Sequence, residues 1–107
     1  MKLVINTCYG RFGIRRFIAE SYGFNQYDES RTNKKLIELI ERGVDCNTSR
    51  SRLEVVEIPD EATDYEIIDR DGAENIHYVI DGKIKHLRGY RGTEWFQWQS
   101  QDGYLIN

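Results

Sequence analysis

The sequence predicts an α+β fold in which two helices pack on a mainly antiparallel sheet built from Asp-Gly hairpins. Apolar residues recur at helical spacing over 14–22 and 32–42. Alternating apolar and polar segments flank Asp-Gly dipeptides at 71–72 and 81–82. Asp-Gly between such segments is a strong hairpin signal, because both central residues of a type I′ turn need positive φ. Helices followed by hairpins are typical of the α+β class.

The first third of the chain is expected to form a strand, a loop and a helix. Residues 2–7, KLVINT, are strand formers, and two glycines interrupt the segment 8–13 that follows. The helix is predicted over 14–22, with Gly23 ending it. Its apolar positions are Ile14, Phe17, Ile18 and Tyr22.

A second helix is predicted over 32–42. Thr32 or Asn33 can cap its beginning, and Gly43 can end it. Its apolar face would consist of Leu36, Ile37, Leu39 and Ile40.

The remaining residues predict strands. LEVVEI at 53–58 stops at Pro59, and DYEIIDR, NIHYVI and KIKHL surround the two Asp-Gly turns. A last hairpin is expected around Asp102-Gly103. Its apolar residues would be Trp95, Phe96 and Trp98.

A two-residue turn fixes which residues pair across a hairpin, and alternation then assigns each side chain to one face of the sheet. Paired residues then sum to 143 across the first turn and to 163 across the second. The core face would carry Tyr65, Ile67, Ile76, Tyr78, Ile80 and Leu87. The opposite face would carry the rows Glu66–His77–His86 and Ile68–Asn75–Arg88.

The row Glu66–His77–His86 has the donor set of some zinc and non-haem iron sites. Three strands spaced by about 4.8 Å would nevertheless place the outer side chains almost 10 Å apart at their roots. We therefore expect polar pairing on a half-exposed face, with no metal and no cofactor.

Composition bounds the class of protein. With 107 residues and 39% hydrophobic content, the chain is expected to form one domain, residues 1–107. No apolar run approaches the roughly 20 residues of a membrane span, and the N-terminus is too polar for a signal peptide. Cys8 and Cys46 stand in no CxxC spacing, which favours a reducing cytoplasm.

Charge is distributed unevenly along the chain. Residues 1–52 hold ten Lys/Arg and six Asp/Glu, a balance of +4, whereas residues 53–107 hold five and twelve, a balance of −7. Because the whole chain is acidic, nucleic acid is not an expected partner. Recognition of an anion would be local.

The segment NTCYGRFGIRR, residues 6–16, is the main candidate for such recognition. A strand, a glycine-bearing loop and a helix start can gather free backbone N–H groups around an anion. Arg11, Arg15 and Arg16 add bidentate phosphate donors, while Tyr9 and Phe12 add rings for stacking on a base. The alternative is a buried Phe12 beside ordinary solvated arginines. No nucleophile elbow, HExxH or phosphate-binding lysine motif is present, so an enzyme is not expected.

Three segments resemble a set of small phage and prophage proteins. INTCYGRFGI is similar to their opening INxCYGGFGLS, and RTNKKLIELIE to their R-x-[DN]-x-x-LV segment. LEVVEIPDEATDYEIIDRDGAENI is similar to their VVEIPDD…[WY]EI…DG…E block. The chain departs from this pattern at Arg11 and Arg15, where the set has Gly and Ser, and in the hairpin that follows Gly72.

This set resembles the phage Thoeris anti-defence sponges of the first type. The resemblance implies a non-enzymatic, oligomeric protein of the infected bacterial cytoplasm that sequesters a cyclic ADP-ribose-type or cyclic nucleotide signal. Arginines and aromatic rings would then grip the diphosphate and the adenine. On chemical grounds, the expected ligand-binding residues are Tyr9, Arg11, Phe12, Arg15, Arg31, Tyr65, Asn75, Arg88 and Arg91.

The alternative function is inhibition of a host defence nuclease, of the anti-CRISPR or anti-restriction kind. Residues 60–74 hold seven acidic side chains and one Arg70, a pattern that could mimic phosphate spacing before a basic surface. The acidic residues are Asp60, Glu61, Asp64, Glu66, Asp69, Asp71 and Glu74.

Overall fold

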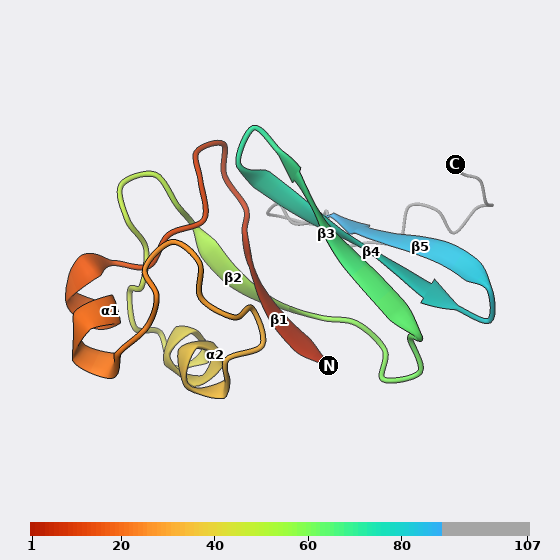
Figure 1. Cartoon of the computed structure of the whole chain (residues 1–107), viewed down its shortest axis with the longest axis horizontal. Helices are drawn as coiled ribbons and strands as arrows, with labels where there is room; N and C mark the ends of the chain where they lie inside the picture. Colours follow the sequence, from red (N-terminus) through yellow and green to blue (C-terminus); the bar gives the residue numbers. More distant parts are fainter. Residues whose placement is uncertain (89–107) are drawn as a thin grey trace.

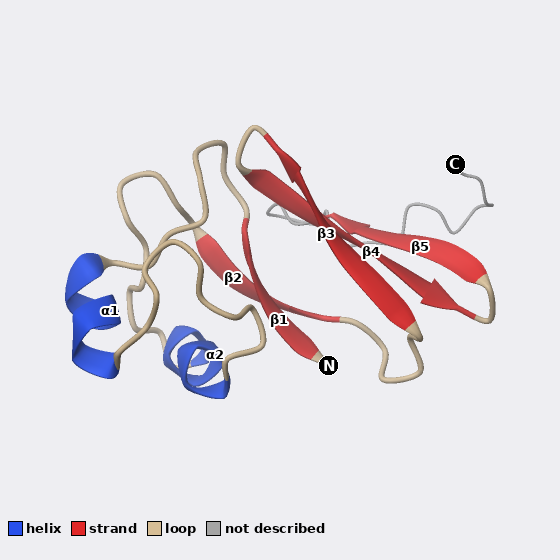
Figure 2. Ribbon diagram, viewed as in Figure 1, coloured by secondary structure: helices blue, strands red, loops and turns tan. Residues whose placement is uncertain are grey.

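The computed structural model describes residues 1–88 as an α+β fold with two helices and two antiparallel sheets (Figure 1). A two-stranded sheet pairs β1 with β2, and a three-stranded sheet has the order β3-β4-β5 (Figure 2). In chain order the elements are β1 (Lys2–Asn6), α1 (Arg16–Tyr22), α2 (Lys34–Glu41), β2 (Leu53–Glu57), β3 (Asp64–Arg70), β4 (Ala73–Ile80) and β5 (Lys83–Arg88). The expected hairpin at 102–103 lies outside the described residues.

The β1–β2 sheet lies in the middle of the molecule, with the helices on one face and the β3–β5 sheet on the other (Figure 1). Alternation along the strands explains this arrangement. Val4 and Leu53 join the core beneath the helices, whereas Leu3 and Val56 join a second core against the β3–β5 sheet. Both faces of this small sheet are therefore buried.

The predicted hairpin register is confirmed. Asp71 and Gly72 form a turn with φ of 55° and 93°, and Asp81 and Gly82 one with φ of 51° and 74°. Arg70 pairs with Ala73 and Ile80 with Lys83, so both rows on the outer face form as predicted. Of the predicted core face, Ile76, Tyr78 and Leu87 are buried and Ile67 and Ile80 partly so, but Tyr65 is exposed.

The first helix is shorter than predicted. It begins at Arg16, because Ile14 instead forms a β-bridge with Asn47 and is fully buried. Phe17, expected on the buried face, is 72% exposed. The second helix is capped by Asn33, whose side chain accepts a hydrogen bond from Leu36 N at 3.0 Å, as one of the two predicted caps. Neither helix of the described part has the length or apolar content to cross a membrane.

Candidate functional site

The glycine-bearing loop after β1 packs directly against the β3–β4 turn. Gly10 N donates to Asp71 O at 3.1 Å, and Arg11 N donates to Arg50 O at 3.0 Å. A Cβ on Gly10 would overlap Arg50 O, and one on Gly72 would overlap the backbone of Gly10. Three segments distant in sequence therefore meet backbone to backbone, and only glycine fits at these two contacts.

Asn6 holds this junction from inside. Its side chain is fully buried, and its Nδ2 donates to Cys8 O at 2.9 Å and to Gly72 O at 2.6 Å. Its Oδ1 accepts from Arg52 N at 2.7 Å. Because the amide bonds to backbone groups of three segments, it fixes the loop relative to the hairpin turn.

A buried ion pair lies behind the junction. Arg31 Nη1 and Nη2 donate to Glu74 Oε1 and Oε2 at 2.7 and 2.9 Å, and Glu74 is only 4% exposed. Glu74 Oε1 also accepts from Asn6 N at 2.7 Å. The Arg31 guanidinium lies over the Phe12 ring, 3.7 Å from its centroid. These contacts link strand β1, strand β4 and the segment that precedes α2.

Two residues expected to bind a ligand therefore have structural roles. Phe12 is 6% exposed and belongs to the core beneath the helices, which corrects its expected stacking on a base. Arg31 has its bidentate donors occupied by Glu74. Glu74 was expected on the acidic face of residues 60–74, but it is buried and paired with Arg31, so it is not part of that face.

Four backbone N–H groups of the predicted anion-binding loop are used within the chain. Ile14 N donates to Gln26 O at 2.9 Å and Arg15 N to Cys46 O at 2.7 Å. Gly10 N and Arg11 N are also used within the chain. These four N–H groups are therefore not free to bind an anion.

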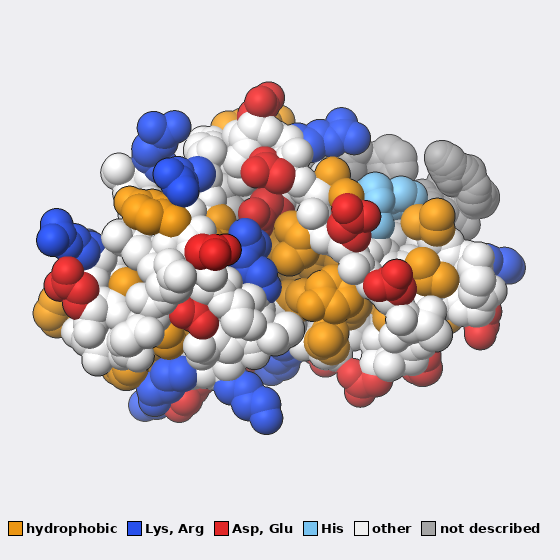
Figure 3. Space-filling model, in the orientation of Figure 1, with side chains coloured by type: hydrophobic (Ala, Val, Ile, Leu, Met, Phe, Trp, Pro, Cys, Tyr) orange, Lys and Arg blue, Asp and Glu red, His pale blue; other side chains and the backbone are white. Residues whose placement is uncertain are grey.

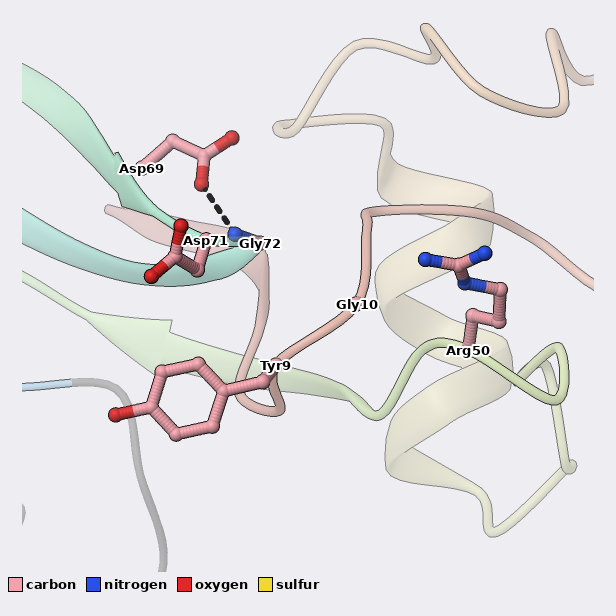
Figure 4. A pocket seen from close by; sticks show the side chains of 6 residues that line it. All are labelled: Tyr9, Gly10, Arg50, Asp69, Asp71 and Gly72. Atoms are coloured by element: carbon pink, nitrogen blue, oxygen red, sulfur yellow. Dashed lines mark hydrogen bonds between the residues drawn. The ribbon is translucent and has the colours of Figure 1, made fainter.

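A solvent-open hollow of about 680 Å³ lies over the junction (Figure 4). It is lined by Tyr9, Gly10, Arg50, Asp69, Asp71 and Gly72. The Tyr9 ring is 80% exposed, and the Arg50 side chain extends from the neighbouring loop on the other side of Gly10. Asp69 and Asp71 lie at the hairpin turn, where Asp69 Oδ1 accepts from Gly72 N at 2.6 Å.

Of the other predicted residues, Arg11, Arg15 and Tyr65 do not line this hollow. The Arg11 guanidinium lies over the Tyr27 ring at 4.2 Å, and Arg15 Nη1 pairs with Asp45 at 3.3 Å. Tyr65 lines a separate hollow of about 400 Å³ with Glu66 and His77. Asn75 pairs in register with Arg88, on the face opposite the core. Arg91 lies outside the described residues.

The sequence reasoning missed Arg50, Asp69 and Asp71 as lining residues. Asp69 and Asp71 had been assigned to the acidic face, and their place at a hairpin turn was predicted. No local signal marks Arg50, because tertiary contacts, among them the hydrogen bond from Arg11 N to Arg50 O, bring its loop to the junction.

The Glu66–His77–His86 row forms in register without assembling a metal site. The two imidazole rings make an edge-to-face contact with centroids 4.2 Å apart. Within residues 1–88, no group of three or more His, Cys, Asp or Glu side chains is placed to hold a metal ion. Burial lowers the pKa of both histidines, and for His77 the charge of His86 lowers it further while Glu66 opposes the shift.

These lowered pKa values predict a pH-dependent stability. In the unfolded chain both histidines titrate near the usual pKa of 6.5. As the pH falls, they therefore take up protons in the unfolded chain before they do so in the folded protein. Stability is then complete above that pH and falls as the pH drops from 6.5 through the folded pKa. We expect urea midpoints to decrease between about pH 7.5 and 5.5. His77→Gln should make this decrease less steep, and an unchanged pH profile would contradict the prediction.

Comparison of this chain with protein-family models, with curated proteins and with solved structures finds no match.

Proposed function

We propose that this chain is a non-enzymatic binding protein that captures a small nucleotide at the Tyr9 hollow. In the form that the resemblance implies, it is a phage anti-defence protein that withholds a cyclic ADP-ribose-type or cyclic nucleotide signal in the host cytoplasm. The observation that supports this proposal is an open hollow lined by an exposed tyrosine, Tyr9, an arginine and two aspartates, on a backbone that the Gly10–Gly72 contact holds in place.

The lining residues match the three parts of a nucleotide. A tyrosine ring stacks on a base, a guanidinium binds phosphate in a bidentate way, and carboxylates accept hydrogen bonds from ribose hydroxyls. Neither Tyr9 nor Arg50 has a side-chain ion pair or ring contact with residues 1–88. The hollow has the volume of a small-molecule site but is open, so affinity would depend strongly on these few groups.

Isothermal titration tests the proposal, with ADP-ribose, cyclic ADP-ribose isomers and cyclic oligonucleotides as probes. Tyr9→Ala and Arg50→Ala are each expected to weaken binding by roughly tenfold or more, since stacking and charge-assisted bonds contribute about 1–3 kcal/mol each. Phe17→Ala and Arg16→Ala are the matched controls, because both residues are exposed on α1 and do not line the hollow. The absence of heat with every probe, or equal losses in the controls, would overturn it.

Inhibition of a host defence protein is the second candidate, supported by the exposed acidic side chains of residues 60–71. Six carboxylates there are exposed, accompanied by one arginine, Arg70. Figure 3 shows basic side chains mostly over the helical half and acidic side chains over both halves. A basic protein surface would fit such a face. Titrations without heat from any nucleotide would favour this candidate.

A further inference from the structure

Within residues 1–88, the edge of strand β3 that faces away from β4 has no neighbouring strand. The strand lies at one side of the β3-β4-β5 sheet, pairs only with β4 among the described residues, and has five of its seven residues exposed (Figure 2). A two-residue turn is closed by a hydrogen-bonded pair, here Arg70 with Ala73. Hydrogen-bonded and non-hydrogen-bonded pairs alternate along an antiparallel ladder. Counted from Arg70, the backbone N–H and C=O groups of Tyr65, Ile67 and Asp69 therefore point away from β4. Tyr65 N accordingly donates to Asp64 Oδ1, at 2.9 Å, rather than to the neighbouring strand.

Two-fold symmetry limits how a second β3 could pair with this edge. A two-fold axis perpendicular to the sheet keeps each side chain on its own face, so opposed residue numbers must have an even sum and one residue must face itself. Placing Glu66 or Asp69 on the axis brings identical carboxylates together. Placing Tyr65 there sets Asp64 against Glu66. These three registers are disfavoured by charge.

The register centred on Ile67 has none of these conflicts. Ile67 faces Ile67, and Asp64 faces Arg70 at both ends, so all seven residues of the strand are paired. A register centred on Ile68 also pairs opposite charges, Glu66 with Arg70, but it places Asp64 against the turn and shortens the ladder. Asp64 and Arg70 are exposed and have no ion pair with residues 1–88. The edge is therefore self-complementary in charge.

We propose that a second copy of this chain pairs antiparallel with β3, centred on Ile67, to form a continuous six-stranded sheet. Tyr65 of the second copy then lies opposite Asp69, on the same face and at the rim of the Tyr9 hollow. In one copy alone, Tyr65 lines a different hollow. A role for Tyr65 in ligand binding rests on the proposed function, whereas the pairing itself does not.

The pairing is expected to be concentration-dependent. Seven residues of edge strand bury less than the roughly 1,200 Å² typical of stable interfaces, so a dissociation constant in the micromolar range is expected. Charged residues on the edge also oppose pairing in other registers, because they would meet like charges or apolar groups there.

A charge exchange across the interface tests the proposal by sedimentation equilibrium of the full chain without nucleotide. Asp64→Arg sets a positive charge against Arg70, and Arg70→Asp sets a negative charge against Asp64. Each variant alone is expected to lose dimerisation by roughly tenfold or more, and an equimolar mixture of the two to recover it as a heterodimer. Glu61→Arg and Lys34→Asp change the net charge equally away from the strand and should dimerise like the unaltered chain.

Each other outcome overturns the pairing or its register. An unaltered chain that is monomeric at several hundred micromolar removes the proposal. Dimers that persist in both single variants place the interface elsewhere, and a mixture that does not recover dimers rules out the register centred on Ile67. Circular dichroism of each variant shows whether a loss is due to unfolding. Titrations with nucleotide address the proposed function separately.

Discussion

Glu74→Ala is expected to lower the free energy of unfolding by about 3–5 kcal/mol, the range for breaking a buried ion pair from one side. The variant leaves the Arg31 guanidinium without its bidentate partner and Asn6 N without an acceptor. The Glu74 side chain is 5% exposed and the Arg31 side chain is 23% exposed, so water can replace little of what is lost. Urea unfolding followed by fluorescence gives the change directly.

Two further variants separate this explanation from a general effect on the hairpin. Glu66→Ala removes an exposed carboxylate from the neighbouring strand and should change stability by less than about 0.5 kcal/mol. The double variant Arg31→Met with Glu74→Leu removes both charges, and it should be more stable than Glu74→Ala alone. A Glu74→Ala variant as stable as Glu66→Ala would show that the ion pair contributes nothing.

The features predictable from the sequence are those encoded locally. Each Asp-Gly turn places both residues at positive φ, and the register of three strands follows from the turn without any tertiary information. The cap at Asn33 is equally local, since its partner is three residues away. These elements fold as their immediate neighbours in sequence require.

The features that were missed depend on contacts between distant residues. Ile14 has the spacing of a helical residue, yet its bridge with Asn47 places it in extended structure, because tertiary pairing overrides periodicity. The split into two sheets likewise depends on which faces of β1 and β2 meet the helices and the β3–β5 sheet. Nothing in the sequence near Arg31 shows that its guanidinium will form an ion pair with Glu74, 43 residues later.

The candidate site shows the same division. Tyr9 was predicted from its own motif and is exposed at the hollow, but Arg50 and the Asp69–Asp71 turn join it only through the fold. Five residues of the segments that carry the resemblance serve the junction. Asn6, Gly10, Phe12, Gly72 and Glu74 each hold or fit one of its contacts. Tyr9 belongs to the same segment, is exposed at the hollow, and is the residue that the proposed function assigns to the ligand.

Gly72→Ala is expected to be among the most destabilising single substitutions, by roughly 3–5 kcal/mol, and Gly82 supplies its control. Both glycines follow an aspartate at positive φ in a two-residue turn, with φ of 93° and 74°. At Gly82 nothing lies within 4 Å of an added Cβ, so Gly82→Ala should cost only the backbone strain of about 1–2 kcal/mol. At Gly72 the same Cβ overlaps the backbone of Gly10, which has no flexible end that can move aside.

The difference between the two variants therefore isolates the contact of the loop with the hairpin. Gly72→Ala must push the loop at Gly10 away from the turn, which breaks the bond from Gly10 N to Asp71 O and the bond from Asn6 Nδ2 to Gly72 O. Hydrogen exchange at Gly10 N should rise strongly in Gly72→Ala and stay unchanged in Gly82→Ala. Because Tyr9 is the residue before Gly10, the proposed nucleotide binding should be lost in Gly72→Ala and retained in Gly82→Ala. Equal stability and equal exchange in the two variants would mean that the turn and the loop are not held together as the structure places them.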